Sequence, residues 1–460
     1  EGEDKIKGYP GHEIAEMALA RLYEVTGEMK YLELCQFFLD VRGQRPYYFD
    51  IEDKERAEHE GRPYRAPGNE ERFHYHQAHV PVREQSEATG HAVRAVYLYS
   101  GMADAARLTG DEAMFAACER LWDSIVNEKL YITGGIGGTH LGEAFSFPYD
   151  LPNDTAYSET CAAIGLAFFA RRMLEIQADN RYSDVMESAL YNTVLAGMAL
   201  DGKSFFYVNP LEVYPEACER DGRKHHVKSV RQKWFGCACC PPNIARIVSS
   251  IGSYIYTQNE STLFTHLYVG SDIITVLNGR TLDIRMLSKM PWDGAAKMVL
   301  HAEEDVTGTL AFRVPGWAPG VEVAIHRMSE DRSFGCCMRY GEFQKYKEDD
   351  STMEYRVENG YVYVTGTWKD EDEIHLIFPI HSHFVSANTK VRENIGKVAL
   401  VRGPLCYCLE EIDNGKDLQL LKLDLNRLWK EWQFEEKGKM YTGKSLNVQW
   451  ENNTDLGHRM

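Results

Sequence analysis

Three cysteines fall within four positions of one short stretch, Gly236-Cys237-Ala238-Cys239-Cys240-Pro241-Pro242-Asn243. Adjacent cysteines on a trans backbone have poor geometry for a mutual disulfide, so these thiols are candidates for burial, for metal binding or for a nucleophile. For this stretch alone, simple packing is an equal alternative, because a free cysteine is often just a small hydrophobic side chain. A second stretch, Ser158-Glu159-Thr160-Cys161, also opens a helical pattern and places a carboxylate beside a thiol. Together the two stretches could supply four ligands to a zinc ion.

A glycine-rich segment, 134–142, precedes another candidate, Glu143. Phosphate-binding loops are rich in glycine, but no Lys-Ser/Thr pair ends this segment and no βαβ pattern precedes it. We expect instead that the glycines let the backbone run close to a ligand. Glu143 lies in a polar loop beside aromatic residues, where its carboxyl could have a raised pKa and serve as a general acid. A solvated loop glutamate is the alternative.

An internal repeat predicts the elements that position these residues. Gly11-His12 opens one helical segment and Gly90-His91 opens another. Each segment ends at a Thr-Gly pair and is followed by a cysteine eight residues later, and both features recur at an offset of 83 positions. A third, diverged copy begins at Glu159. Such hairpins bury their apolar faces by stacking into a solenoid or a closed toroid.

The repeat places three polar residues, His12, His91 and Glu159, at equivalent helix starts. Cys240 stands just before the next such helix, which is predicted over 242–257. If the first helix of each hairpin lies in an inner ring, these residues converge on one mouth of that ring. A lone histidine at a helix start is more often a side chain that meets solvent. Four matched helix starts favour a shared site.

Apolar residues recur at helical spacing through the first 258 residues. The long polar linkers 43–83 and 129–157 are expected to carry function, because linkers above about 15 residues usually do so in a compact domain. The predicted helices are 11–25, 29–42, 84–108, 111–128, 158–178, 182–199 and 242–257.

From about residue 259 the pattern changes to short alternating stretches between Gly, Pro, Asp and Asn clusters, which is typical of β-sandwiches. We predict one β-sandwich over 259–385 and a second β-rich segment, incomplete, over 386–460. The cysteines at 336, 337, 406 and 408 have no acid or histidine at matched spacing, so we assign them to packing. Strands are expected at 263–269, 309–314, 361–364, 397–401 and 405–409.

Composition limits the classes of partner. The net charge of -18 argues against nucleic acid and against an anionic membrane surface. No run of 18 apolar residues is present, which argues against a membrane-spanning helix. The eleven cysteines are an odd number without the spacing of a disulfide framework, so we expect free thiols in a reducing, cytoplasmic compartment. The length of 460 residues suggests about three domains.

Motifs spread over nearly the whole chain carry a family resemblance. They are Gly11-His12-Glu13, Pro81-Val82-Arg83, Gly90-His91-Ala92-Val93-Arg94-Ala95, Gly134-Gly135-Ile136-Gly137, Gly142-Glu143-Ala144-Phe145, Tyr157-Ser158-Glu159-Thr160-Cys161, Cys239-Cys240-Pro241-Pro242-Asn243, Val314-Pro315-Gly316-Trp317 and Gly403-Pro404-Leu405. Through them the chain resembles the β-L-arabinofuranosidases of glycoside hydrolase family 127. The resemblance implies a helical toroid of the (α/α)6 type over 1–258, followed by β-sandwich domains.

The resemblance also implies an unusual glycosidase chemistry. Cys239 would be the nucleophile that attacks the anomeric carbon, and Glu143 would be the general acid and then the base. A covalent glycosyl intermediate followed by hydrolysis gives net retention. The implied zinc ligands are Glu159, Cys161, Cys239 and Cys240, and the implied sugar-binding residues are His12, His91, Glu187 and Tyr207. The substrate would be a plant-derived oligosaccharide or glycopeptide that carries β-L-arabinofuranose.

Two features depart from the family pattern. Cys237 is an additional thiol, either a spare ligand or merely buried. Seven predicted helices do not fill a ring of twelve, so about five would precede residue 1 and the chain would hold a partial toroid. The alternatives are a glycosidase for another L-sugar of plant cell-wall polysaccharide and a catalytically inactive, zinc-containing carbohydrate-binding protein. Intact Glu143 and Cys239 argue against the inactive protein. A homodimer is a possible assembly.

Overall fold

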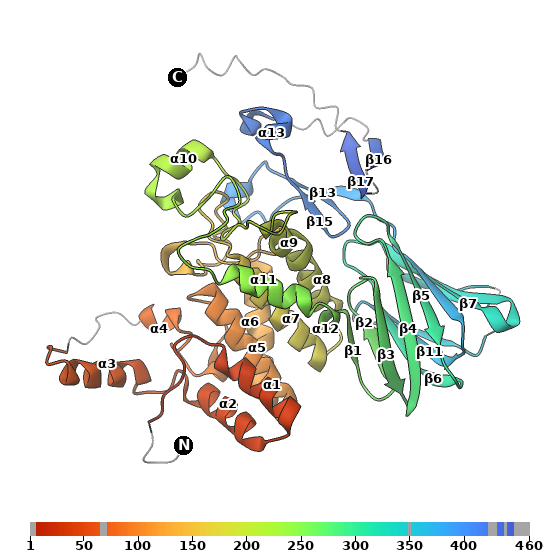
Figure 1. Cartoon of the computed structure of the whole chain (residues 1–460), viewed down its shortest axis with the longest axis horizontal. Helices are drawn as coiled ribbons and strands as arrows, with labels where there is room; N and C mark the ends of the chain where they lie inside the picture. Colours follow the sequence, from red (N-terminus) through yellow and green to blue (C-terminus); the bar gives the residue numbers. More distant parts are fainter. Residues whose placement is uncertain are drawn as a thin grey trace.

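The computed structural model describes residues 6–64, 71–347, 349, 351–421, 430–436 and 439–445. A helical unit comes first in the chain and β-sheet units follow it, as the sequence predicts (Figure 1). The β-sandwich, green to cyan in Figure 1, lies beside the helical unit, and a small blue sheet lies above their junction. The helices are α1 (Ala15–Thr26), α2 (Met29–Val41), α3 (Tyr48–His59), α4 (Glu71–Tyr75), α5 (Ala92–Thr109), α6 (Glu112–Glu128), α7 (Thr160–Ile176), α8 (Asn180–Ser188), α9 (Leu195–Gly197), α10 (Pro215–Arg220), α11 (Cys240–Ser249), α12 (Gly252–Ile255) and α13 (Glu411–Asn414).

The predicted repeat is a pair of helical hairpins, α1–α2 and α5–α6. Helices α1 and α5 each end at the threonine of a Thr-Gly pair, and the next residue is left-handed, with φ 71° at Gly27 and 70° at Gly110. Glycine adopts that conformation without strain, which explains why the pair ends each helix. The matched cysteines, Cys35 in α2 and Cys118 in α6, are both fully buried.

The first helices of the hairpins form one row. Helix α5 packs against α1 on one side and α7 on the other, and α11 packs against α7. Helices α2, α6 and α8 each pack against the row helix that precedes them in the chain. Close packing in the row requires small residues: a Cβ at Gly165 of α7 would come within 2.5 Å of Val96 in α5. This row brings the starts of α1, α5, α7 and α11 to one region.

Several helix boundaries differ from the prediction. Helix α5 begins at Ala92 rather than at residue 84, because the chain makes one 3-10 turn at Val82–Glu84 and then extends to the cap residue His91. The segment 182–199 is interrupted by a π-helical turn, Ala189–Val194. Helices α3 and α4 lie in the linker 43–83, where none was predicted; α3 has many charged residues and projects from the body of the protein (Figure 1).

The β-sandwich has two sheets. Their strand orders are β1-β2-β6-β11-β10 and β3-β4-β5-β12-β7-β8-β9. Trp368 and Ile374, one from each sheet, are fully buried in the core between them. The strands are β1 (Tyr256–Gln258), β2 (Thr262–Thr265), β3 (Ser271–Leu277), β4 (Arg280–Ser288), β5 (Ala295–His301), β6 (Val306–Arg313), β7 (Gly320–Arg327), β8 (Arg332–Arg339), β9 (Glu342–Lys345), β10 (Glu354–Glu358), β11 (Tyr361–Trp368) and β12 (Asp372–Ile377).

A three-stranded antiparallel sheet of β13 (Ser382–Val385), β14 (Ala399–Arg402) and β15 (Leu405–Tyr407) follows, and β16 (Lys430–Glu436) pairs with β17 (Lys439–Ser445). Much of the segment predicted over 386–460 lies outside the described residues. Cys336 is buried, as the packing assignment predicts, whereas Cys408 is exposed, so that assignment is wrong for Cys408. Among the described residues, no helix has both the length and the apolar character needed to cross a bilayer.

Candidate active site

Four helix starts meet at one place in the helical unit. His91, Glu159 and Cys239 occupy the N-cap positions of α5, α7 and α11, while His12 lies just before α1. The rings of His12 and His91 are 6.2 Å apart. The side-chain ligand atoms of His91, Glu143 and Glu159 all lie within 4.8 Å of one another. The structure therefore gathers polar residues from the row α1, α5, α7 and α11 and adds Glu143 from the glycine-rich loop.

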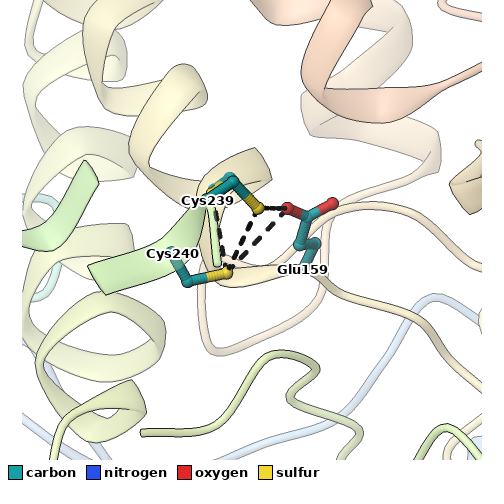
Figure 2. Close-up of side chains that lie close together, drawn as sticks. Glu159, Cys239 and Cys240 are labelled. Carbon is teal, nitrogen blue, oxygen red and sulfur yellow. Dashed lines mark hydrogen bonds between the residues drawn. The ribbon is translucent and has the colours of Figure 1, made fainter. Parts of the chain in front are cut away.

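Glu159 and three cysteines form a compact cluster of possible metal ligands. One ligand atom from each of Glu159, Cys161, Cys239 and Cys240 lies within 4.8 Å of the others. Figure 2 shows Glu159, Cys239 and Cys240 with their side chains pointing toward one another. The Cys239 Sγ is 3.2 Å from Glu159 Oε1, and the Cys161 and Cys240 sulfurs are 3.5 Å apart. That separation is much longer than the S–S bond of a disulfide, so the two cysteines are not cross-linked and both sulfurs can coordinate the same ion.

Burial makes this donor set suited to an ion. Glu159, Cys161 and Cys240 are all at most 3% exposed, and Cys239 is half-buried. Burial raises the pKa of Glu159 well above its ordinary value, and the charge of Cys239 acts in the same direction. Buried groups of this kind need a counter-charge when ionised. Three sulfurs and one carboxylate match a four-ligand tetrahedral site for a metal ion.

The local sequence fixes the cysteine stretch at a helix start. Helix α11 begins at Cys240, and Pro241 and Pro242 fill its first turn, where the missing N–H groups need no partner. Asn243 donates a side-chain hydrogen bond to the Tyr97 hydroxyl (2.7 Å), which ties α11 to α5. Cys237 is exposed and lies outside the four-residue cluster, so the alternative that it is merely buried is wrong.

The glycine-rich loop packs against Ser158, the residue that precedes Glu159. A Cβ at Gly135 would meet the Ser158 hydroxyl at 2.1 Å, and a Cβ at Gly134 would meet the backbone of Ala189 at 2.5 Å. The Ser158 amide donates to the Gly137 carbonyl (2.9 Å). The close approach that these glycines allow is therefore to the chain's own segments, whereas the sequence had suggested a ligand.

Hydrogen bonds around Cys239 favour its thiolate. Those from Cys161 and Cys240 lower the pKa of the Cys239 thiol most, and the Tyr207 hydroxyl, 3.1 Å from the sulfur, acts in the same direction. The position at the N-terminus of α11 adds the positive end of a helix dipole. The Tyr207 carbonyl accepts a hydrogen bond from the Thr160 amide (2.9 Å), so the segment that carries this tyrosine is attached to the start of α7.

Both carboxylate oxygens of Glu143 are held. The Tyr157 hydroxyl donates to Oε1 (3.0 Å), and His91 Nε2 lies 3.1 Å from Oε2. His91 Nδ1 accepts from the Arg94 amide (3.4 Å) as the cap of α5, so in the neutral ring the proton is on Nε2 and points at Glu143. The hydrogen bond from His91 is the main cause that lowers the pKa of Glu143, although burial opposes it. The expectation of a raised pKa is therefore wrong for this carboxyl.

The structure brings together three of the four predicted sugar-binding residues. His12, His91 and Tyr207 surround Glu143 and Cys239, and burial lowers the pKa of His12 to about 4, with the Arg94 charge acting in the same direction. The fourth, Glu187, contacts residues of the β-sandwich instead.

The Glu187 carboxylate binds Arg313 (2.5 Å) and the Trp317 indole (2.8 Å) of the β-sandwich. It lines a separate cavity of about 140 Å³ between the helical unit, the sandwich and the small sheet. The contacts recorded for Glu187 are thus interdomain contacts and not contacts with the residues around Cys239.

Two functional neighbours were not singled out from the sequence. Tyr157 is part of a quoted motif but had no assigned role, although it contacts Glu143 directly. Arg94 hydrogen-bonds to the Gly11 carbonyl and so attaches the segment that carries His12 to α5. The sequence contains a hint of this role, because Arg94 follows His91 by three residues in the second repeat. Only the fold shows what Arg94 binds.

Comparison with known proteins decides the family. The model of the β-L-arabinofuranosidase GH127 catalytic domain matches residues 1–253, the GH127 middle domain matches 262–334 and the family 127 C-terminal domain matches 382–446. The chain belongs to glycoside hydrolase family 127. Every residue of the cluster, together with Glu143 and Tyr157, lies within the part that matches the GH127 catalytic domain.

This GH127 chain is similar to known proteins in sequence and in fold. The chain is 39% identical over 429 residues to the non-reducing end β-L-arabinofuranosidase of Bifidobacterium longum subsp. longum, and it covers 60% of that relative's length. A GH127 β-L-arabinofuranosidase structure from Geobacillus stearothermophilus T6 superposes with a TM-score of 0.84 at 45% identity, over 97% of this chain and 70% of the other. A second GH127 β-arabinofuranosidase structure gives 0.76 at 33% identity, over 96% and 66%. These structures support a helical barrel followed by β domains.

Proposed function

We propose that this GH127 chain carries the active site of a retaining glycoside hydrolase that releases β-L-arabinofuranose from the non-reducing ends of plant-derived glycans or glycopeptides. The names of its relatives support the sugar and the reaction class. The observation that carries the proposal is the position of Glu143, held by His91 and Tyr157, directly beside the cluster that contains Cys239. A binding protein would need neither a held carboxylate nor a thiol with a lowered pKa.

The metal that best suits the cluster is zinc. The donors are three soft sulfurs and one carboxylate oxygen, a set that selects zinc over magnesium or calcium. Glu159, Cys161, Cys239 and Cys240 would hold it. When bound, zinc would keep its thiol ligands deprotonated at neutral pH and balance the charge of Glu159.

The first chemical step forms a bond between Cys239 Sγ and the anomeric carbon. The glycosidic C–O bond breaks, and the Glu143 carboxyl gives its proton to the departing oxygen. Because its hydrogen-bond donors favour the ionised form of Glu143, the carboxyl must take up a proton before this step. Tyr207, hydrogen-bonded to the sulfur, orients the thiolate.

The second step returns the enzyme to its starting state. The Glu143 carboxylate removes a proton from water, the water oxygen attacks the anomeric carbon, and the C–S bond breaks to release the Cys239 thiolate. Two inversions at the same carbon give net retention. In this step the hydrogen bonds from His91 and Tyr157 keep the carboxylate aimed at the water. His12, His91 and Tyr207 would line the sugar, while Glu187 joins the domains.

The test is turnover of a chromogenic β-L-arabinofuranoside, with the anomer of the product followed by NMR. We expect β-L-arabinofuranose as the first product, and we expect Glu143→Gln and Cys239→Ser to lose this activity. Turnover of a different L-sugar in its place would redirect the proposal to another glycosidase. Sugar and zinc binding without any turnover would establish a binding protein instead.

A further inference from the structure

Two tyrosines connect the two reacting side chains of the proposed site. The Tyr157 hydroxyl donates to Glu143 Oε1 (3.0 Å), and the Tyr207 hydroxyl is hydrogen-bonded to Cys239 Sγ (3.1 Å). The two rings meet edge to face, with centroids 6.0 Å apart and planes at 69°. Each tyrosine therefore holds one reacting group and also limits the movement of the other tyrosine.

Glu143 needs such support because of its place in the chain. It follows Gly142 (φ 69°) and itself has φ 53°, a conformation that costs a non-glycine residue free energy. The neighbouring backbone is anchored, since Thr139 and Ala144 exchange hydrogen bonds (3.2 and 3.1 Å). Among the described residues, the recorded anchors of the Glu143 side chain are other side chains and not backbone groups. It is 37% exposed, and within the described part of the chain its recorded partners are Tyr157 and His91.

Tyr157 is itself held rigidly. Its ring also packs near His226, with centroids 5.6 Å apart. Its backbone runs directly into Ser158, whose amide bonds the Gly137 carbonyl (2.9 Å) and whose carbonyl accepts from the Asn209 side chain (3.0 Å). A hydroxyl on so constrained a ring fixes its acceptor in one orientation. The recorded hydrogen bond of that hydroxyl, among the described residues, goes to Glu143.

We propose that Tyr157 is a positioning residue for both proton transfers of the reaction, acting through its hydrogen bond to Glu143 Oε1; this inference rests on the proposed function. Without the Tyr157 hydroxyl, His91 remains as one donor to Glu143. The carboxylate can then rotate about the bond that joins it to the rest of the Glu143 side chain. The nucleophile and the sugar contacts keep their partners. The rate of steps in which Glu143 moves a proton should fall, and substrate binding should change little.

The experiment compares Tyr157→Phe with a matched control, Tyr131→Phe. Tyr131 is buried and Tyr157 is half-buried, and the Tyr131 hydroxyl donates one hydrogen bond to the Pro152 carbonyl (3.0 Å), so the control loses one such bond away from Glu143. With an alkyl arabinofuranoside, which needs acid assistance, we expect Tyr157→Phe to lower kcat on the order of 10²-fold with little change in KM. With a nitrophenyl substrate, removal of the sugar from Cys239 becomes limiting.

Azide then separates positioning from a general structural effect. It attacks the anomeric carbon of the glycosyl-cysteine intermediate without needing a base, so the C–S bond breaks and an arabinosyl azide forms. We expect azide to accelerate nitrophenyl turnover by Tyr157→Phe and by Glu143→Gln, but not by wild type or Tyr131→Phe. The ratio of rates with and without azide does not depend on the fraction of folded enzyme, so it remains decisive if the variant is less stable.

Two failures can be told apart. If Glu143→Gln shows neither a dependence on the leaving group nor rescue by azide, the proposed function is wrong. If Glu143→Gln behaves as expected while Tyr157→Phe matches Tyr131→Phe in kcat, KM and azide response, Tyr157 has no positioning role and this inference is overturned.

Discussion

Replacing one cluster ligand tests the metal site most directly. Cys161→Ser changes one atom in a side chain that is 1% exposed and whose sulfur lies 3.5 Å from Cys240 Sγ. A serine hydroxyl is a much poorer zinc ligand than a thiolate, and at neutral pH it stays protonated. The substitution should therefore weaken zinc binding while it leaves the shape of the core nearly unchanged.

The magnitude follows from the size of the donor set. Structural zinc sites of four ligands contribute about 10–16 kcal/mol in all, hence roughly 2.5–4 kcal/mol for each ligand. If the serine hydroxyl retains a small part of the binding free energy of one ligand, zinc binding weakens by about 2–3 kcal/mol, which is on the order of a hundredfold in affinity. Cys118→Ser is the matched control, because Cys118 is equally buried, in α6, and lies outside the cluster.

The assay is zinc content of the purified protein, followed by competition with a graded series of chelators. We expect about one zinc per chain in wild type and in Cys118→Ser, with wild-type affinity in both. We expect Cys161→Ser to lose its zinc to chelators about a hundredfold weaker. In wild type, removal of zinc should lower Tm, because Glu159, the buried thiols of Cys161 and Cys240 and the half-buried thiol of Cys239 then lack a counter-charge. Equal zinc affinity in Cys161→Ser and Cys118→Ser would refute the ligand assignment.

Three further predictions concern the chemistry and the domain junction. Glu143→Gln should slow alkyl substrates by about 10²–10⁴-fold and nitrophenyl substrates much less in the step that releases the aglycone; equal losses in pre-steady-state measurements of that step would contradict the acid role. An electrophilic arabinofuranose analogue should alkylate Cys239 alone, and peptide mapping that finds the label on Cys240 would overturn the choice of nucleophile. Arg313→Met should lower the free energy of unfolding by about 3–5 kcal/mol, because it leaves the Glu187 carboxylate buried without its cationic partner; urea unfolding with a loss below 1 kcal/mol would show that this ion pair adds little.

Much of the site could be predicted from local sequence because the repeat sets it. A Thr-Gly helix end and a buried cysteine recur at one offset, so the repeat predicted that His12 and His91 lie at matched helix starts. The structure brings their rings within 6.2 Å, but His91 is the N-cap of α5 whereas His12 lies before Ile14, the N-cap of α1. The grouping of Glu159 with the cysteine stretch followed from the same reasoning, and their atoms meet within 4.8 Å. These predictions depend on periodicity and on short-range rules for ending helices.

What the sequence did not predict depends on contacts between distant segments. The lowered pKa of Glu143 comes from donors on two other elements, His91 and Tyr157, so neither its loop nor its neighbours could indicate the direction. The place of Glu187 depends on which face of α8 meets the sandwich, and that is decided by Arg313, which lies 126 residues away. Helix α3 lacks an apolar period because it projects from the body, and the pattern that predicts helices depends on burial.

The row of helices also explains why so many acidic groups can share one buried place. Each helix start presents the positive end of a dipole, equivalent to roughly half a charge, although the two prolines in the first turn of α11 leave that helix with fewer free N–H groups. In this chain the starts of α5, α7 and α11 carry His91, Glu159 and Cys239 as cap residues, so three such ends face the same cluster. The positive helix ends favour the ionised forms of the carboxyl and thiol groups over the protonated forms. They would also offset part of the mutual repulsion among these anions that one divalent ion does not neutralise. The repeat that buries the apolar faces therefore also brings together helix ends whose dipoles favour negatively charged side chains in the cluster.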